Sequence, residues 1–237
     1  MNKQIRQIIN KLKELGDAEI ASHSQGFFKT GKGEYGEGDI FLGIRVPVIR
    51  QCVKEYHDIS LDDTLKILKS PFHEARLLAL LILVKKYTLE KTVAGKNAIY
   101  RSYLNNTKYI NNWDLVDLSS YQIVGAHLYF RDKKPIYRLV RSKDLWERRI
   151  GVLATFYFIK YGQFTDSLAV AELLLNDRED LIHKAVGWML REVGKRELKV
   201  EEEFLIKHYK EMPRTMLRYA IERFPEKKRL SYLKGTK

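Results

Sequence analysis

The sequence has little of what several common classes of protein need. Cys52 is the only cysteine among the 237 residues, so the chain can form no internal disulfide and no cysteine-built zinc site, which fits a reducing cytoplasm. The longest purely apolar run, from Leu77 to Val84, is far shorter than the roughly 18–20 residues of a membrane span. The N-terminus reads as an amphipathic helix without the apolar core of a signal peptide. We therefore expect a cytoplasmic protein that does not enter a membrane.

Motifs for metal, nucleotide and nucleophilic chemistry are also absent from the sequence. The six histidines show no HExxH pattern and no close clustering with Asp of the metal-ligand type, and no GxSxG motif occurs. Four glycines fall within residues 31–38, but the stretch lacks the GK[ST] ending of a phosphate-binding loop. We expect no metal and no cofactor. The glycine-rich stretch is interpreted as a flexible loop or, alternatively, as a loop that contacts a partner through its backbone.

Proline is scarce, and its positions agree with a helical chain. The five prolines are at positions 47, 71, 135, 213 and 225, and the segments between them place apolar residues three and four apart. Ser60 is a suitable N-cap, and Ser70 followed by Pro71 predicts another helix start at Pro71. The predicted fold class is all-α.

The charge is strongly positive and unevenly distributed. Forty-three Lys and Arg against thirty Asp and Glu give a net charge of +13 and a pI near 9.6. The first sixty residues contain nine bases and eight acids, so the excess lies in residues 61–237. This favours a polyanionic partner such as nucleic acid over an anionic membrane surface. A modestly basic protein without such a partner is the alternative.

Similar segments recur along the chain at a nearly constant interval. They begin near residues 74, 111, 147, 183 and 216, which are 33–37 residues apart. A period of this length, made of two helices without strands, predicts an α-solenoid of the HEAT or armadillo kind. We expect a single domain over residues 1–237, with a basic concave groove lined by the second helix of each pair. The predicted exposed bases of that groove are Arg76, Arg148, Arg149, Lys184, Arg191, Lys195 and Arg218.

Two tryptophans and one aspartate are candidates for chemistry. Trp113 and Asp117 are four residues apart, which places them on one helix face. Asn112 or Asp114 is interpreted as a residue that caps or polarises the helix start. Asp117 lies one turn further along between apolar neighbours, where an unpaired carboxylate is costly, so we expect it to have a partner or a functional role. Trp188 follows Gly187, which permits close approach of a backbone or a ligand. Both indoles could stack on a nucleotide or could be packed core.

Four motifs give the chain a resemblance to a known family. They are FLGIRVP at residues 41–47, NWDLVD at 112–117, LWERR at 145–149 and KAVGWMLRE at 184–192. In these motifs, over about residues 20–225, the sequence resembles the HEAT-like-repeat DNA alkylation repair family. One departure is Asn112, where an aromatic residue is typical of the family.

The resemblance implies a C-shaped solenoid that clasps duplex DNA and hydrolyses the N-glycosidic bond of cationic N3- and N7-alkylpurines without extruding the base. It implies that Asp117 is the catalytic carboxylate, that Trp113 and Trp188 meet the deoxyribose, and that Arg149 is a groove arginine. The DNA-binding positions that it implies, with Arg45 the least secure match, are Arg45, Arg148, His183, Lys184, Arg191 and Lys195.

Three functions follow as hypotheses. The first is a monofunctional, monomeric alkylpurine DNA glycosylase whose partner is damaged duplex DNA. The second is a DNA-binding solenoid without catalytic activity. The third is a scaffold for a protein partner, which the combination of Trp113, Asp117, Arg149 and Trp188 in a basic chain disfavours.

Overall fold

The computed structural model describes residues 3–237, and every regular element within them is a helix. Two compact units are present, one ending at Ser119 and the other spanning Ser120–Lys237. None of the helices in residues 3–237 is long and apolar enough to cross a membrane. The all-α prediction is confirmed. The prediction that residues 1–237 form a single domain stays a prediction.

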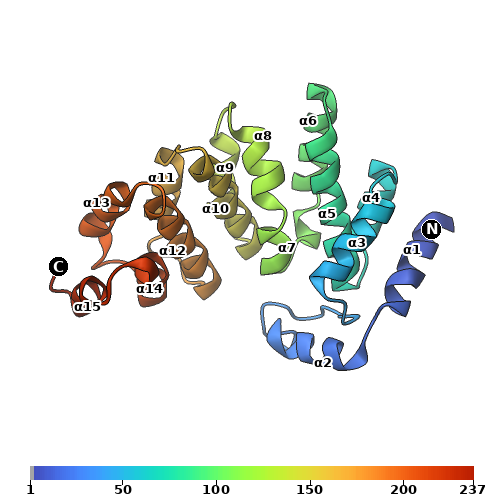
Figure 1. The fold of residues 1–237 in the computed structure, drawn as a ribbon, viewed down its shortest axis with the longest axis horizontal. Coiled ribbons are helices and arrows are strands. Elements are labelled where there is room, and N and C mark those ends of the chain that lie inside the picture. Colours follow the sequence, from blue (N-terminus) through green and yellow to red (C-terminus); the bar gives the residue numbers. More distant parts are fainter. Residues whose placement is uncertain (1–2) are drawn as a thin grey trace. The chain divides into compact units, whose positions relative to one another are not determined.

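The first unit is organised around one long, buried helix. Its elements are α1 (Lys3–Glu14), α2 (Ala18–Phe27), α3 (Val46–Tyr56), α4 (Leu61–Leu68), α5 (His73–Leu89), α6 (Val93–Leu104), a 3₁₀ turn (Thr107–Tyr109) and α7 (Trp113–Asp117). Helices α1, α3, α4, α6 and α7 all pack on α5, which lies among them in Figure 1. Because α5 is covered on several sides, nearly its whole first three turns are buried, and it has no single apolar face.

The second unit stacks helical hairpins. It comprises the π-helical turn η2 (Tyr121–Gly125), α8 (Ala126–Leu128), α9 (Lys134–Leu139), α10 (Leu145–Lys160), α11 (Thr165–Leu173), α12 (Asp180–Gly194), α13 (Leu198–His208), α14 (Arg214–Ala220), a 3₁₀ turn (Ile221–Arg223) and α15 (Glu226–Lys234). Helix α10 packs on η2 and α12, and α12 packs on α14. Gly187 makes the last contact possible, because a Cβ there would lie 2.4 Å from the backbone oxygen of Met216.

The repeat register agrees with the observed helices. Helices α5, α7, α10, α12 and α14 begin within three residues of the predicted starting points, so the prediction of paired helices is confirmed. Ser60 caps α4 as predicted, accepting a hydrogen bond from the Asp63 N–H (3.0 Å). The predicted helix start at Pro71 is wrong. Helix α5 begins two residues later, because the chain at Phe72 stays extended and Ser70 accepts the Phe72 N–H instead.

Candidate functional site

A stack of aromatic rings surrounds Trp113 in the first unit. The indole of Trp113 is half-buried and lies parallel to the Phe28 ring, with centroids 5.1 Å apart. Phe28 stacks in turn on Phe41 (4.9 Å), and Phe41 on the His73 imidazole (4.3 Å). Phe27, which is 58% exposed, meets Trp113 edge to face at 6.0 Å. Trp113 is therefore neither free in solvent nor fully enclosed in a core.

Phe27 and Phe28 are parts of this site that the sequence reasoning missed. They lie at the end of α2, more than eighty residues before Trp113, so no local spacing connects them to it. The only available signal was an aromatic pair directly before a glycine-rich loop. That loop folds back on the pair, since a Cβ at Gly36 would lie 2.4 Å from the Phe28 carbonyl oxygen.

The glycine-rich loop is held by its own carboxylates. Glu34 Oε2 accepts a hydrogen bond from the Gly31 N–H (2.9 Å), and Glu37 Oε2 accepts one from the Gly33 N–H (2.8 Å). These two N–H groups are therefore already satisfied within the loop. The interpretation as a loop that contacts a partner through its backbone gains no support at Gly31 and Gly33.

The short helix α7 carries both Trp113 and Asp117. Asn112 is its N-cap and accepts a hydrogen bond from the Trp113 N–H (2.8 Å), so the residue that departs from the family motif has a structural role. Asp117 is half-buried at the last helical position. Burial raises the pKa of the Tyr103 hydroxyl, a hydrogen bond with Ser119 opposes this, and the negative charge of Asp117 raises it further. Asp117 thus places its charge beside a buried phenol.

A buried charged cluster lies beneath the aromatic stack. His73 Nδ1 is 3.0 Å from Asp39 Oδ2, and His73 Nε2 is 2.8 Å from Asp114 Oδ2. Arg76 also pairs with Asp39. Burial lowers the pKa of His73, but attraction to Asp114 and hydrogen bonds with both carboxylates outweigh it and raise the pKa to about 9. His73 is therefore an imidazolium near neutral pH that donates to both carboxylates.

This cluster forms from residues that are remote in sequence, and it corrects one expectation. The two carboxylates that reach His73 come from residues 34 and 41 positions away from it. Arg76, expected on an exposed groove, is 5% exposed, because its guanidinium binds Asp39 and the carbonyl oxygens of Ser70 and Pro71. Within residues 3–237 no group of His, Cys, Asp or Glu has the arrangement of a metal site.

In the second unit, Trp188 has an oriented indole. It is half-buried on α12, and its Nε1–H donates to Glu192 Oε1 (3.2 Å) one turn further along. The Phe156 ring packs against it with centroids 6.0 Å apart. Glu192 also accepts from Lys195 (2.5 Å) and Arg196 (3.0 Å), which leaves these two bases paired.

Arg148 and Arg149 have intramolecular partners. Arg148 Nε donates to Asp177 Oδ2 (2.7 Å), and its Nη1 donates to the carbonyl oxygens of Ser142 and Lys143. Arg149 is 5% exposed and donates to the Leu181 carbonyl oxygen (2.5 Å). The expectation that Arg149 is an exposed groove base is wrong, because α10 turns it into the interior of the unit.

The remaining predicted DNA contacts are spread over the two units. His183 Nε2 is 2.6 Å from the Asp177 carbonyl oxygen, Lys184 pairs with Asp180 (2.7 Å), and Arg191 pairs with Glu222. Arg218 on α14, which was predicted as an exposed base of the groove, is exposed.

Arg45, which the sequence also placed among the DNA contacts, lies in the first unit. It is exposed and lines a hollow of about 730 Å³ together with Asp17 and Glu19. Acidic residues therefore lie near Arg45. Their negative charge makes the binding of a phosphate at Arg45 less favourable than it would be at a base without acidic neighbours.

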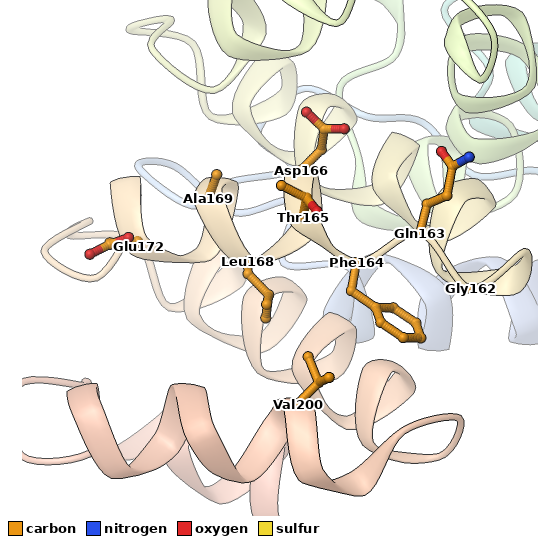
Figure 2. A pocket seen from close by; sticks show the side chains of 9 residues that line it. All are labelled: Gly162, Gln163, Phe164, Thr165, Asp166, Leu168, Ala169, Glu172 and Val200. Carbon is orange, nitrogen blue, oxygen red and sulfur yellow. The ribbon is translucent and has the colours of Figure 1, made fainter.

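A hollow of about 670 Å³ in the second unit lies apart from these residues. It is lined by residues of α11, of the turn before it and of α13, which are Gly162, Gln163, Phe164, Thr165, Asp166, Leu168, Ala169, Glu172 and Val200 (Figure 2). Asp166 in its wall accepts a hydrogen bond from the Tyr137 hydroxyl (2.8 Å). None of the predicted site residues lines this hollow.

Comparison with known proteins identifies a family through a family model and a shared fold through a solved structure. A family model described as "DNA alkylation repair enzyme" matches residues 8–224. No curated protein matches the chain. A solved structure described as "Predicted DNA alkylation repair enzyme from Enterococcus faecalis" is 15% identical, with a TM-score of 0.67 over 89% of this chain and 97% of that chain. At this level of identity the likeness shows a shared fold.

Proposed function

Because the chain belongs to the DNA alkylation repair enzyme family, we propose that it is a DNA glycosylase that hydrolyses the N-glycosidic bond of cationic N3- and N7-alkylpurines in duplex DNA. The observation that carries the proposal is the helix α7, which holds the Asp117 carboxylate one turn from the Trp113 indole, and this indole is stacked on Phe28. The net charge of +13 suits a duplex as the substrate.

Alkylation makes the purine a cation and therefore a good leaving group. As the bond from C1′ to the purine nitrogen breaks, its electron pair neutralises the base, and the sugar gains oxocarbenium character. A fixed carboxylate at Asp117 stabilises that positive charge and orients the water that attacks C1′. The water proton passes to the carboxylate or to solvent. The face of Trp113 attracts the same cation through its π electrons.

Trp188 and Arg149 keep proposed roles from the second unit. The Glu192 hydrogen bond orients the Trp188 indole, which supports a contact with the apolar face of a deoxyribose. Because the Arg149 guanidinium is buried, Arg149 would not contact the substrate directly. It would act indirectly, by fixing the position of the Leu181 backbone with its hydrogen bond. We propose that the base stays in the helix, because contacts to sugar and backbone do not require its extrusion.

The test is base release from duplex DNA that carries one 7-methylguanine, under single-turnover conditions. Asp117→Asn removes the charge with little change of shape and should slow release by about 100- to 1000-fold. Asp62→Asn is the matched control, because Asp62 is an exposed aspartate in the first turn of α4. Equal rates for wild type and Asp117→Asn would exclude the proposed role of Asp117.

The alternative is a DNA-binding protein without catalytic activity. The same assay separates the two, because this alternative predicts binding of the duplex with no base release by the wild type. Binding through phosphates should weaken steeply as salt increases. Binding that is independent of salt would contradict both DNA-directed functions.

A further inference from the structure

Both residues that flank Trp113 are tied to one buried ion pair. On its N-terminal side, Asn112 Nδ2 donates to Asp39 Oδ2 (3.2 Å). On its C-terminal side, Asp114 Oδ2 accepts from His73 Nε2 (2.8 Å). Asp39 and His73 are themselves joined at 3.0 Å. Hydrogen bonds to the Asp39–His73 pair therefore hold the peptide segment on both sides of Trp113.

The same imidazole supports the indole through the aromatic stack. His73 packs on Phe41 at 4.3 Å and lies 5.2 Å from Phe28, tilted by 40°. Phe28 is the ring that lies flat against Trp113. Displacing His73 would therefore disturb Trp113 by two routes, one through hydrogen bonds and one through ring packing.

Helix α7 needs such support because it is only five residues long. The first hydrogen-bonded turn of a helix is unfavourable by itself, so a helix of one turn persists only where tertiary contacts hold it. Asp114 provides such a contact near the start of α7, between Trp113 and Asp117. A buried ion pair contributes little net stability compared with apolar residues of the same volume, although loss of one of its two charges is costly because the other charge stays buried. A defined geometry is the property that such a cluster can supply.

We propose that the Asp39–His73 pair is a positioning device that holds α7, and with it Trp113 and Asp117, in the geometry required for base release. The inference deepens the proposed function and rests on it for its catalytic part. His73 and Asp39 do not touch the substrate in this proposal, and they act through Asn112, Asp114 and the aromatic stack.

The charge state of His73 supports the same role. The groups that face it are Asp39 from the loop and Asp114 from α7, and Arg76 from α5 pairs with Asp39. The pKa of His73, raised to about 9, keeps both ring nitrogens as donors near neutral pH. Loss of the proton would turn one ring nitrogen into an acceptor facing a carboxylate, and that link to α7 or to the loop would break.

The first experiment observes Trp113 directly, without substrate. The full chain is labelled with 5-fluorotryptophan, and the ¹⁹F resonance of Trp113 is assigned with Trp113→Phe. His73→Gln should shift or broaden this resonance and leave those of Trp146 and Trp188 unchanged. In the wild type the Trp113 resonance should titrate with a midpoint near pH 9, and in His73→Gln it should not.

The matched control is His57→Gln. His57 lies at the end of α3 in the same unit, where its ring contacts the Lys54 carbonyl oxygen (3.0 Å) and the Asp58 carboxylate (3.0 Å). This variant should leave the Trp113 resonance as in the wild type. If His73→Gln does not fold, Asp39→Asn carries the test, because it weakens the same pair from the loop side.

The second experiment separates positioning from binding. His73→Gln should lower the single-turnover rate of 7-methylguanine release by about 10- to 100-fold, as expected for a misplaced catalytic group, and keep the Kd for the duplex within twofold. An unchanged Trp113 resonance in His73→Gln overturns the proposal. So does a perturbed resonance with an unchanged rate.

Failure of the proposed function is a distinct outcome. If the wild type releases no base, the glycosylase proposal fails. The ¹⁹F spectra then still decide whether the Asp39–His73 pair positions Trp113.

Discussion

Raising the pH from 6 to 9.5 should remove a stabilising charge from the interior of the first unit. The group concerned is His73, which is 1% exposed and lies between the carboxylates of Asp39 and Asp114. Its pKa is raised from 6.5 to about 9, so the folded protein holds this proton more tightly than the unfolded chain does. The stabilisation is complete below pH 6.5, decreases between pH 6.5 and 9, and is absent above pH 9.

The size of the effect follows from the two pKa values of His73. One pH unit corresponds to about 1.4 kcal/mol, so the interval from 6.5 to about 9 gives a loss of about 3 kcal/mol in the free energy of unfolding. His73→Gln has no proton to lose at this position and should lack this part of the pH dependence. All other titrating groups are common to the two proteins, so the difference between them isolates His73.

Urea unfolding followed by circular dichroism measures this difference at pH 6, 7, 8, 9 and 9.5, at constant ionic strength. The wild type should be more stable than His73→Gln at pH 6, and the difference should shrink by about 3 kcal/mol by pH 9.5. Parallel pH profiles for the two proteins would refute the reasoning. They would mean that the pKa of His73 is the same in the folded protein as in the unfolded chain, so that the two carboxylates do not hold its proton.

Three further substitutions test other parts of the structure. Gly43→Ala should reduce stability by about 2–4 kcal/mol in urea unfolding, because Gly43 has φ +82° and a Cβ would lie 2.0 Å from the Asp17 carbonyl oxygen. A Gly43→Ala variant as stable as the wild type would contradict this backbone geometry. Burial and the charge of Glu202 raise the pKa of Glu201 to about 8, so stability should fall as pH rises from 4.5 to 8. In thermal unfolding, the stability of Glu201→Gln relative to the wild type should therefore be greater at pH 9 than at pH 5. The same stability difference between the two proteins at both pH values would be evidence against the raised pKa. Arg148→Ala should cost about 3 kcal/mol of stability by leaving the nearly buried Asp177 without its ion-pair partner. Unchanged stability together with weaker DNA binding would mean that Arg148 contacts DNA and is not needed for the fold.

The local features of the fold could be predicted because they depend on neighbours in the sequence. The spacing of apolar residues indicated helices, and the recurrence near every 36 residues indicated helical pairs, since each pair must bury the same stripe. Ser60 and Asn112 are N-caps because their side chains reach N–H groups one to three residues away. Gly187 was correctly linked to close approach of a neighbouring backbone.

The burial of the arginines could not be predicted from the same information. Arg76 and Arg149 occupy helix positions where an exposed base was expected, and both are 5% exposed. Whether an Arg faces solvent depends on acceptors that come from distant parts of the chain. Asp39 is 37 residues from Arg76, and the Leu181 carbonyl oxygen is 32 residues from Arg149. A net charge of +13 therefore overstates the number of bases available to a phosphate.

The sequence by itself determined an all-helical repeat chain with Trp113 and Asp117 on one helix, because helix formation and capping are set by residues within one or two turns. Only the tertiary structure decided what holds that helix. The Asp39–His73 pair and Phe28 come from segments that are remote in sequence, and their convergence depends on the packing of the loop after α2 against α5 and α7. Packing of that kind leaves no periodic signal in the sequence, since these residues do not recur at a fixed interval.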